Sequence, residues 1–425
     1  MLRCPKTELS GVLAIRLGWR SSVRWVTMAS LLSSLSCSSI WDPFLLTRCA
    51  NGEACGRDMS GSGTSDMLPN GASDFAGMPP TLFGTATNFL VGSGPNSVAV
   101  GDFNGDMKLD VVSANSNSNN VSVLLGSGLG GLGAAVNFPV GSRPNSVAVG
   151  DFNGDKKLDV VSANSGSANV SVLLGNGLGG FVATNFSVGT TPSSVAVGDF
   201  NGDLKLDLTI ADFQSNSVSV LLGNGIGGFG IAMNPPSIGP SWQVAVGDFN
   251  GDMKLDLAVA SSGSGGVSVL LGNGTGGFSA ATNFPVGSSP SSVAVGDFNG
   301  DLKSDLAVAN RFNVGVLLGN GTGSFGAATN FPVGDENRAV AVGDFDGDLR
   351  PDLAVAVASS SASSQNSIGV LLGNGAGGFG AATYFPVGSC PVSVAVGDFN
   401  GDLKPDLAVA NCNSDNVSVL LNQSR

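Results

Sequence analysis

The sequence predicts an all-β protein, a seven-bladed β-propeller with four antiparallel strands per blade, closed by pairing of its N- and C-terminal segments. Three observations lead to this prediction. A motif D-F-N-G-D-x-x-x-D starts seven times, at steps of 47 to 54 residues, with Asp346 in place of the asparagine in the sixth copy. Short apolar runs flank every copy of the motif. A segment before the first copy matches the strand that the last copy lacks.

Each repeat contains four short segments that are typical of strands and are separated by glycine and asparagine turns. One apolar run precedes the motif, as in Ser97–Gly101, and another follows it, as in Leu255–Ala260. A third run reads V-S-V-L-L-G in most copies, as in Val267–Gly272, and the fourth segment of that copy is Phe278–Gly287. Four strands per period correspond to one propeller blade.

The central runs are apolar on both faces instead of alternating, which indicates strands that are buried on both sides. A single blade cannot bury its own faces, so the repeats must stack. An open solenoid is the alternative. It needs distinct polar caps, whereas the first and last copies have the sequence of internal repeats.

The two ends of the repeat region are expected to share one blade. The last copy ends at Val419–Asn422 without a fourth strand, and Leu82–Gly92 matches the missing strand. Pairing of these segments closes the ring and removes the exposed edges that an open stack of sheets would present.

The propeller is predicted to occupy residues 81–425, after a leader of residues 1–55 and a Gly/Ser-rich linker of residues 56–80. Arginines precede an uncharged stretch at residues 25–41, which indicates a secretory signal. An organelle transit peptide and an extension from an over-long gene model, with Met28 as another start, remain open. A secretory signal would make the protein secreted or extracellular.

Composition excludes several classes of function. The formal net charge is −13, and nucleic acids and anionic membranes attract basic patches instead. The chain has no histidine, which excludes His-based acid–base catalysis, Ser-His-Asp triads and His-ligated zinc. A bound metal would therefore be a hard ion with oxygen ligands. No uncharged run is apolar over 18 or more residues, so no membrane insertion is expected.

Residues 81–425 resemble the FG-GAP/VCBS repeat family, whose propellers occur in integrin α-subunits and many extracellular proteins. The resemblance rests on the nine-residue motif, which recurs in phase with three strand patterns. Phe-Gly pairs at Phe229-Gly230, Phe325-Gly326 and Phe379-Gly380 add to it. It implies a ring used for structure, adhesion or ligand binding, with calcium in the loop between the first two strands of a blade.

The motif also supplies the oxygen ligands that Ca²⁺ requires. Ca²⁺ takes six to eight oxygens, and side chains at positions 1, 3, 5 and 9, with the carbonyl of position 7, let one loop wrap the ion. Clustered carboxylates repel one another unless a cation is present. Seven Ca²⁺ ions would change the net charge from −13 to about +1. The predicted ligands are Asp102, Asn104, Asp106, Lys108, Asp110, Asp151, Asn153, Asp155, Lys157, Asp159, Asp199, Asn201, Asp203, Lys205, Asp207, Asp248, Asn250, Asp252, Lys254, Asp256, Asp297, Asn299, Asp301, Lys303, Asp305, Asp344, Asp346, Asp348, Arg350, Asp352, Asp398, Asn400, Asp402, Lys404 and Asp406.

A metal-free Asn-Gly turn, in which the aspartates cap local amides, is the alternative. Position 6 favours this alternative, because calcium loops of the family have glycine there and this chain has residues such as Met107 and Lys156. A residue with a Cβ is strained in a left-handed conformation. Gly105 and its equivalents at position 4 could take part of the turn. The basic side chain at position 7 is expected to be a solvated surface charge.

Two cysteines occur together in the last copy only. Cys390 and Cys412 lie on either side of its motif, so they are predicted to form a disulfide, with two unrelated buried thiols as the alternative. The Gly-rich stretch Leu271–Phe278 lies between two strands with no helix after it. It is therefore predicted to be a tight turn and not a phosphate-binding loop.

Four large side chains break the repeat pattern near the loops that follow the second strands. They are Phe213, Trp242, Arg311 and Phe312. Such loops are the usual place for ligand contacts, although each substitution taken singly favours an incidental change.

The leading hypothesis is a non-catalytic, extracellular, calcium-binding propeller that acts in adhesion or recognition. It would be a monomer and bind a protein or glycan ligand on one face of the ring. A carbohydrate-binding lectin is the alternative. A hydrolase is disfavoured, because no nucleophile–base pair or cofactor motif is present and aspartates that recur seven times suit metal binding better than one active site.

Overall fold

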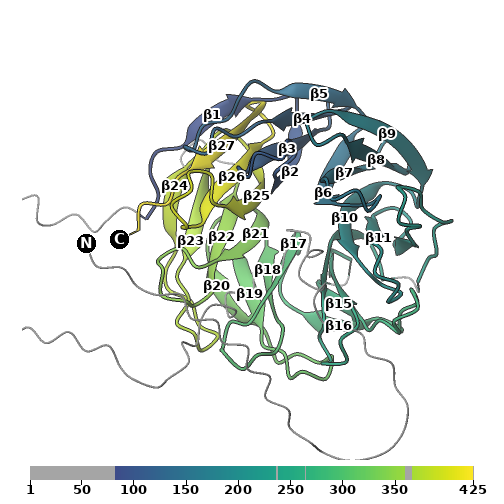
Figure 1. The fold of residues 1–425 in the computed structure, drawn as a ribbon. Coiled ribbons are helices and arrows are strands. Elements are labelled where there is room, and N and C mark those ends of the chain that lie inside the picture. Colours follow the sequence, from purple (N-terminus) through teal and green to yellow (C-terminus); the bar gives the residue numbers. More distant parts are fainter. Residues whose placement is uncertain (1–81, 236–237, 264, 359–365, 425) are drawn as a thin grey trace, which may run out of the picture. The chain divides into compact units, whose positions relative to one another are not determined.

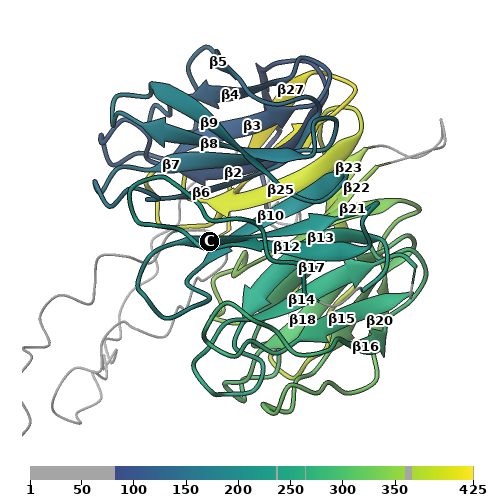
Figure 2. The same cartoon turned by 90° about the vertical axis from the view of Figure 1, so that its right-hand side faces the viewer.

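The computed structural model describes residues 82–424, except residues 236–237, 264 and 359–365. The described part is all-β, and its antiparallel sheets form the seven blades of a propeller (Figures 1 and 2). Among the described residues, no helix is long and apolar enough to span a bilayer. The predicted leader and linker lie outside the described residues.

Every blade begins with the same three strands in the same order. The first strands are β2 (Pro95–Gly101), β6 (Pro144–Gly150), β10 (Pro192–Gly198), β13 (Ser241–Gly247), β17 (Ser292–Gly296), β21 (Asn337–Gly343) and β25 (Pro391–Gly397). The second strands are β3 (Asp110–Asn115), β7 (Asp159–Asn164), β11 (Asp207–Asp212), β14 (Asp256–Ser261), β18 (Asp305–Asn310), β22 (Asp352–Val357) and β26 (Asp406–Asn411). The third strands are β4 (Asn120–Leu124), β8 (Asn169–Gly175), β12 (Ser217–Leu221), β15 (Gly266–Leu270), β19 (Asn313–Leu317), β23 (Ser367–Leu371) and β27 (Asn416–Leu420).

The outer strands complete six of the seven blades. They are β5 (Val136–Pro139), β9 (Phe181–Ser187), β16 (Thr282–Pro285), β20 (Thr329–Pro332), β24 (Thr383–Pro386) and, in blade 7, β1 (Thr87–Leu90). Blades 1 to 7 are numbered in the chain order of their first strands. The fold class predicted from the repeats is confirmed.

The stacking of the blades follows from the apolar second and third strands. All residues of all seven second strands are buried, as expected for runs that are apolar on both faces. The first strands of neighbouring blades contact one another all the way round the ring, including β2 with β25. The repeats therefore form a closed ring and not an open solenoid.

Ring closure occurs where it was predicted. In blade 7 the sheet order is β1-β27-β26-β25, and β1 pairs antiparallel with β27 from Thr87↔Val419 to Leu90↔Asn416. Phe83 precedes β1, is 2% exposed and makes edge-to-face contacts with Phe345 of blade 6. The segment before the first repeat thus supplies both a strand and a core side chain.

A phenylalanine cluster and a backbone hydrogen bond join neighbouring blades. Phe249, at motif position 2 of blade 4, lies 5.7 Å from Phe325 of blade 5, measured between ring centroids, and Phe325 also contacts Phe284 of β16. The Phe249 carbonyl accepts a 2.8 Å hydrogen bond from the Gly323 amide of blade 5. Equivalent bonds occur at five other junctions, and at the junction of blades 6 and 7 the Phe345 carbonyl accepts a hydrogen bond from the Asn422 side chain instead. Each motif loop is therefore fixed to the next blade.

Blade 3 departs from this pattern at its outer edge. Its sheet contains β10, β11 and β12, and the described residues of the next segment pair with β12 at one bridge, Val220↔Met233, with two 2.8 Å hydrogen bonds. Pro235 stands where blade 4 has Phe284, by alignment with Met233 and Thr282. Proline has no amide to donate to a strand ladder, which limits the pairing.

Two local predictions from the sequence are confirmed. Cys390 and Cys412 form a disulfide with Cα atoms 5.2 Å apart, which joins the start of β25 to the turn after β26. The Gly-rich stretch of blade 4 is a tight turn, closed by a 2.9 Å hydrogen bond from the Asn273 amide to the Gly277 carbonyl.

Candidate metal centre

The seven motif loops connect the first and second strands of the blades. Since strand order and direction are the same in each blade, all seven loops lie on one face of the ring, which we call the Asp-loop face. The opposite face carries the turns between the second and third strands.

Backbone amides hold the carboxylate at position 1 inside each loop. In the first loop, the amides of Gly105 and Met107 donate 2.7 Å hydrogen bonds to the two carboxylate oxygens of Asp102. The Asp106 amide donates to Oδ1 of Asn104, and the Lys108 amide donates to Oδ1 of Asp106. The side chains of positions 1, 3 and 5 are therefore gathered on the inside of the turn.

The amide of position 6 donates to the carboxylate of position 1 although the residue at position 6 is not glycine. Position 6 has φ between 61° and 66° in all seven loops, and the glycine at position 4 has φ between 75° and 80°. The turn therefore uses two left-handed residues, and the second carries a Cβ at a cost of about 1 kcal/mol. Its side chain gains no burial, since Met107 is 94% exposed.

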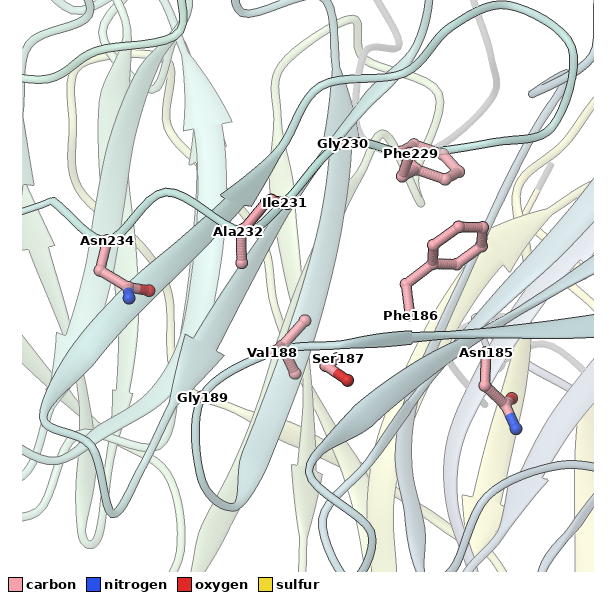
Figure 3. Close-up of a pocket in the computed structure, with 10 residues that line it drawn as sticks. All are labelled: Asn185, Phe186, Ser187, Val188, Gly189, Phe229, Gly230, Ile231, Ala232 and Asn234. Carbon is pink, nitrogen blue, oxygen red and sulfur yellow. The ribbon is translucent and has the colours of Figure 1, made fainter.

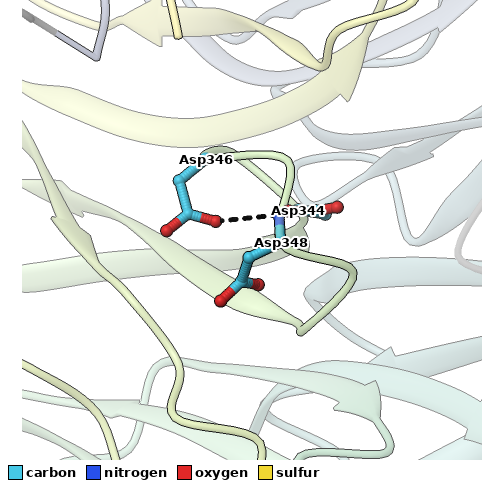
Figure 4. A group of neighbouring side chains, drawn as sticks. All are labelled: Asp344, Asp346 and Asp348. Atoms are coloured by element: carbon cyan, nitrogen blue, oxygen red, sulfur yellow. Dashed lines mark hydrogen bonds between the residues drawn. The ribbon is translucent and has the colours of Figure 1, made fainter. Parts of the chain in front are cut away.

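The sixth loop concentrates three carboxyl groups. Asp344, Asp346 and Asp348 lie on one turn (Figure 4), and one carboxylate oxygen of each lies within 4.8 Å of the other two. Burial raises the pKa of Asp346, and the charges of Asp348 and Asp344 add to the rise. The loop therefore places mutually repelling acids together, as a cation-binding loop does.

The basic side chain at position 7 bends back over its own loop. The Lys254 ammonium lies 3.0 Å from Oδ2 of Asp252 and lowers the pKa of that carboxyl. Lysine or arginine pairs with position 5 in the first six loops, at 3.0 to 3.6 Å. The lysine side chains are 43% to 45% exposed, so the expected surface charge lies directly beside an acid of its own loop.

The aspartate at position 9 has a different environment from the other acids. Asp159 is fully buried, and its two oxygens accept 2.9 Å and 2.7 Å hydrogen bonds from the amides of Phe152 and Gly175. Burial raises its pKa to about 6. The same two bonds recur in every blade and join the start of the loop to the strand beyond it.

An aromatic pair on the opposite face was not foreseen from the sequence as a unit. Phe213 of blade 3 and Trp242 of blade 4 have ring centroids 4.5 Å apart, and Trp242 is 44% exposed. At the blade 5 turn, the Arg311 guanidinium lies 5.2 Å from the centroid of the Phe312 ring. The signal in the sequence was that Phe213, directly after β11, and Trp242, in β13 of the next repeat, each replace a small residue.

Solved structures with the same architecture have low sequence identity to this chain. BBS1N, solved in complex with ARL6DN, is 14% identical with a TM-score of 0.58, over 82% of this chain and 98% of that one. An Agrocybe aegerita lectin that recognises non-reducing terminal N-acetylglucosamine is 18% identical with a TM-score of 0.51, over 79% and 97%. Hydrazine synthase of Kuenenia stuttgartiensis is 14% identical with a TM-score of 0.53, over 83% and 99%. At these identities the likeness shows the fold alone.

Family comparison gives a more specific result. No curated protein matches the chain. The family model described as FG-GAP-like repeat matches six times, at residues 102–162, 151–210, 200–259, 248–308, 297–355 and 350–409. These matches cover well over half of the chain, and each runs from the motif loop of one blade into the second strand of the next. The chain therefore belongs to the FG-GAP-like repeat family.

Proposed function

We propose that this protein is a non-catalytic, extracellular recognition module whose seven motif loops bind Ca²⁺. The cluster of Asp344, Asp346 and Asp348 carries the proposal. Ca²⁺–oxygen distances are about 2.3–2.6 Å, so two oxygens on one ion are at most about 5 Å apart. The oxygens of this cluster lie within 4.8 Å of one another, which fits a single ion.

Positions 1, 3 and 5 would hold the ion through side-chain oxygens, together with the carbonyl of position 7. The ion would neutralise the clustered carboxylates and displace the ammonium that pairs with position 5. The buried carboxylate at position 9, whose oxygens already accept two amide bonds, would mainly fix the ends of the loop. The loop amides that hold position 1 would keep this geometry ready for the ion.

Calcium should stabilise the fold, because an ion that binds only the folded loops shifts the unfolding equilibrium. With affinities of about 10⁻⁴ to 10⁻³ M, typical of extracellular modules, ~10 mM Ca²⁺ adds roughly 1–3 kcal/mol per occupied loop. Calorimetric titration and melting curves in excess chelator and in Ca²⁺ measure this. An unchanged melting temperature would refute calcium binding.

Asp346→Asn is the matched variant for the sixth loop. It gives this loop the asparagine that the other six have at position 3. We expect this variant to weaken Ca²⁺ binding at the sixth loop and to leave Ca²⁺ binding at the other loops unchanged in the calorimetric titration.

Recognition without catalysis is supported by the family and by the composition. The chain has no histidine, and its acidic motif recurs seven times instead of forming one site. Propellers of the same fold serve different functions, as the ARL6DN complex, the lectin and hydrazine synthase illustrate. The fold therefore does not identify the ligand, which depends on the side chains at the surface of this chain.

The exposed aromatic pair supports a glycan ligand as a second candidate function. The face of a sugar ring stacks on an exposed indole, and neighbouring hydroxyl groups such as that of Ser193, which donates to the Ser241 carbonyl, form a polar rim. The Phe213 ring holds Trp242 from one side.

Trp242→Ala should reduce binding on a glycan array by roughly tenfold or more, because aromatic anchors contribute 2 kcal/mol or more at such sites. Leu302→Ala, on the Asp-loop face, is the control, since Leu302 is 83% exposed at the opposite end of the blades. Equal loss in both variants, or no glycan bound by the parent protein, would exclude this site.

A further inference from the structure

A polar relay crosses three strands in blades 1, 2 and 7. In blade 1, Nδ2 of Asn115, at the end of the second strand, donates a 2.8 Å hydrogen bond to Oγ of Ser122 in the third strand. That hydroxyl donates a 2.6 Å bond to Oδ1 of Asn137 in the outer strand. Blades 2 and 7 repeat the relay with distances of 2.6 to 2.9 Å. It fastens each outer strand to the interior of its blade.

In blade 3 an aspartate takes the place of the first asparagine. Asp212 is fully buried, and its Oδ2 accepts a 2.6 Å hydrogen bond from Oγ of Ser219. Its Oδ1 is buried without a partner. In blade 1 the corresponding atom, Oδ1 of Asn115, accepts a hydrogen bond from the Ser113 hydroxyl. Blade 3 has Ile210 in place of Ser113 and so lacks this donor.

The single hydroxyl proton of Ser219 limits what this network can do. Oγ of Ser219 lies 2.6 Å from Oδ2 of Asp212 and 3.1 Å from Oδ1 of Asn234, which are both acceptors. If Asp212 is ionised, the hydroxyl can satisfy only one of them. If Asp212 is protonated, it donates to Ser219 and frees the hydroxyl for Asn234, which reproduces the asparagine relay.

The surroundings of Asp212 favour the neutral form. Burial raises its pKa to about 7, although hydrogen bonds from the Ser219 hydroxyl and the Gly189 amide oppose this rise. The groups that face it are Ser219 of β12, Gly189 before β10 and, through Ser219, Asn234 of the outer segment. None of these groups carries a charge that could pair with a carboxylate.

We infer that Asp212 is held as a neutral acid in the folded protein, and that its ionisation breaks the Ser219–Asn234 hydrogen bond and loosens the outer segment of blade 3. The described part of this segment forms no regular strand, and its one bridge pair with β12 is that of Val220 with Met233. Backbone hydrogen bonds from Gly230 to Leu222 and from Ile238 to Asn216 flank this pair. It lines a surface pocket of about 510 Å³ opposite Asn185 of β9, as Figure 3 shows. One wall of this pocket therefore responds to pH, whether or not the loops bind calcium.

Asp212→Asn tests the inference through stability. A proton held by the folded state and lost by the unfolded state makes stability fall as pH rises from about 4 to about 7. The variant removes this contribution. The melting temperature of the variant minus that of the parent should therefore increase by about 2 °C or more between pH 5 and pH 8. Asn411→Asp in blade 7 is the matched converse. Asn411 occupies the position of Asp212, and its Oδ1 has no hydrogen-bond donor because Val409, like Ile210 in blade 3, carries no hydroxyl group. This substitution should bring the same pH dependence into blade 7.

Hydrogen exchange in the parent protein provides a local measurement that needs no variant. The Met233 amide donates to the Val220 carbonyl, and Thr282 is the equivalent residue of blade 4, whose relay positions hold no acid. Exchange of Met233 relative to Thr282 should rise roughly tenfold from pH 6 to pH 8. A constant ratio, or a melting-temperature difference between parent and Asp212→Asn that does not change with pH, would overturn the inference.

Discussion

Removal of residues 1–92 should abolish cooperative folding, because it takes away the strand that closes the ring. β27 would lose its pairing with β1, and unpaired strand edges recruit other chains. The same truncation removes Phe83, whose ring packs against Phe345 and Phe385 between blades 6 and 7. We expect insoluble or non-cooperatively melting protein, measured by expression yield and calorimetry.

Removal of residues 1–73 is the control for this experiment. It leaves β1 and Phe83 in place and takes away only sequence without a repeat. This shorter truncation should melt like the full chain. If both truncations behave alike, β1 contributes nothing to closure, and blade 7 is stable with three strands.

Phe249→Ala should have the second-largest effect, a loss of about 3–5 kcal/mol of unfolding free energy. The ring is 2% exposed and packs against Phe325 of the next blade, so truncation leaves a cavity at the junction of blades 4 and 5. The backbone bonds of Phe249 to Asp256 and Gly323 would persist, because they need no side chain. Urea unfolding measures the change.

Met253→Ala is the matched substitution in the same loop. Met253 is 94% exposed, and exposed side chains of this kind change stability by about 0.5 kcal/mol or less. Similar losses for the two variants would mean that the phenylalanine cluster does not hold the blades together.

The repeat made most of the fold predictable from the sequence. Seven copies in phase defined the blades, and the match between Leu82–Gly92 and the missing last strand located the closure. Cys390 and Cys412 were paired from their joint appearance in one copy. Such inferences succeed because the stacking of strands depends on an apolar pattern that recurs in each repeat.

The individual roles of the loop residues could not be predicted from the same pattern. Positions 1 and 9 are both aspartates, but Asp102 lies in an exposed turn and Asp110 is buried between two backbone amides. Spacing alone does not reveal which aspartate accepts hydrogen bonds from backbone amides of the neighbouring strand. The Lys108 ion pair with Asp106 likewise depends on the path of a long side chain.

Blade 3 shows a second limit of repeat-based inference. Pro235 and Asp212 are single departures that look minor in an alignment of copies. Their effects depend on neighbours across the sheet, namely Ser219 and Asn234, and appear only when the strands are placed side by side.

The pairing of β1 with β27 also constrains how the chain folds. Asn88 and Ser418 are hydrogen-bonded partners 330 positions apart, while the strands within each blade are joined by short turns. Closing a flexible loop of that length costs about 5 kcal/mol of chain entropy, far more than closing a hairpin. Local blades should therefore form first and the joint between β1 and β27 last. Until that step, β1 is without a partner and β27 has a free edge, so the slowest contact to form is also the one that protects the chain from association during synthesis.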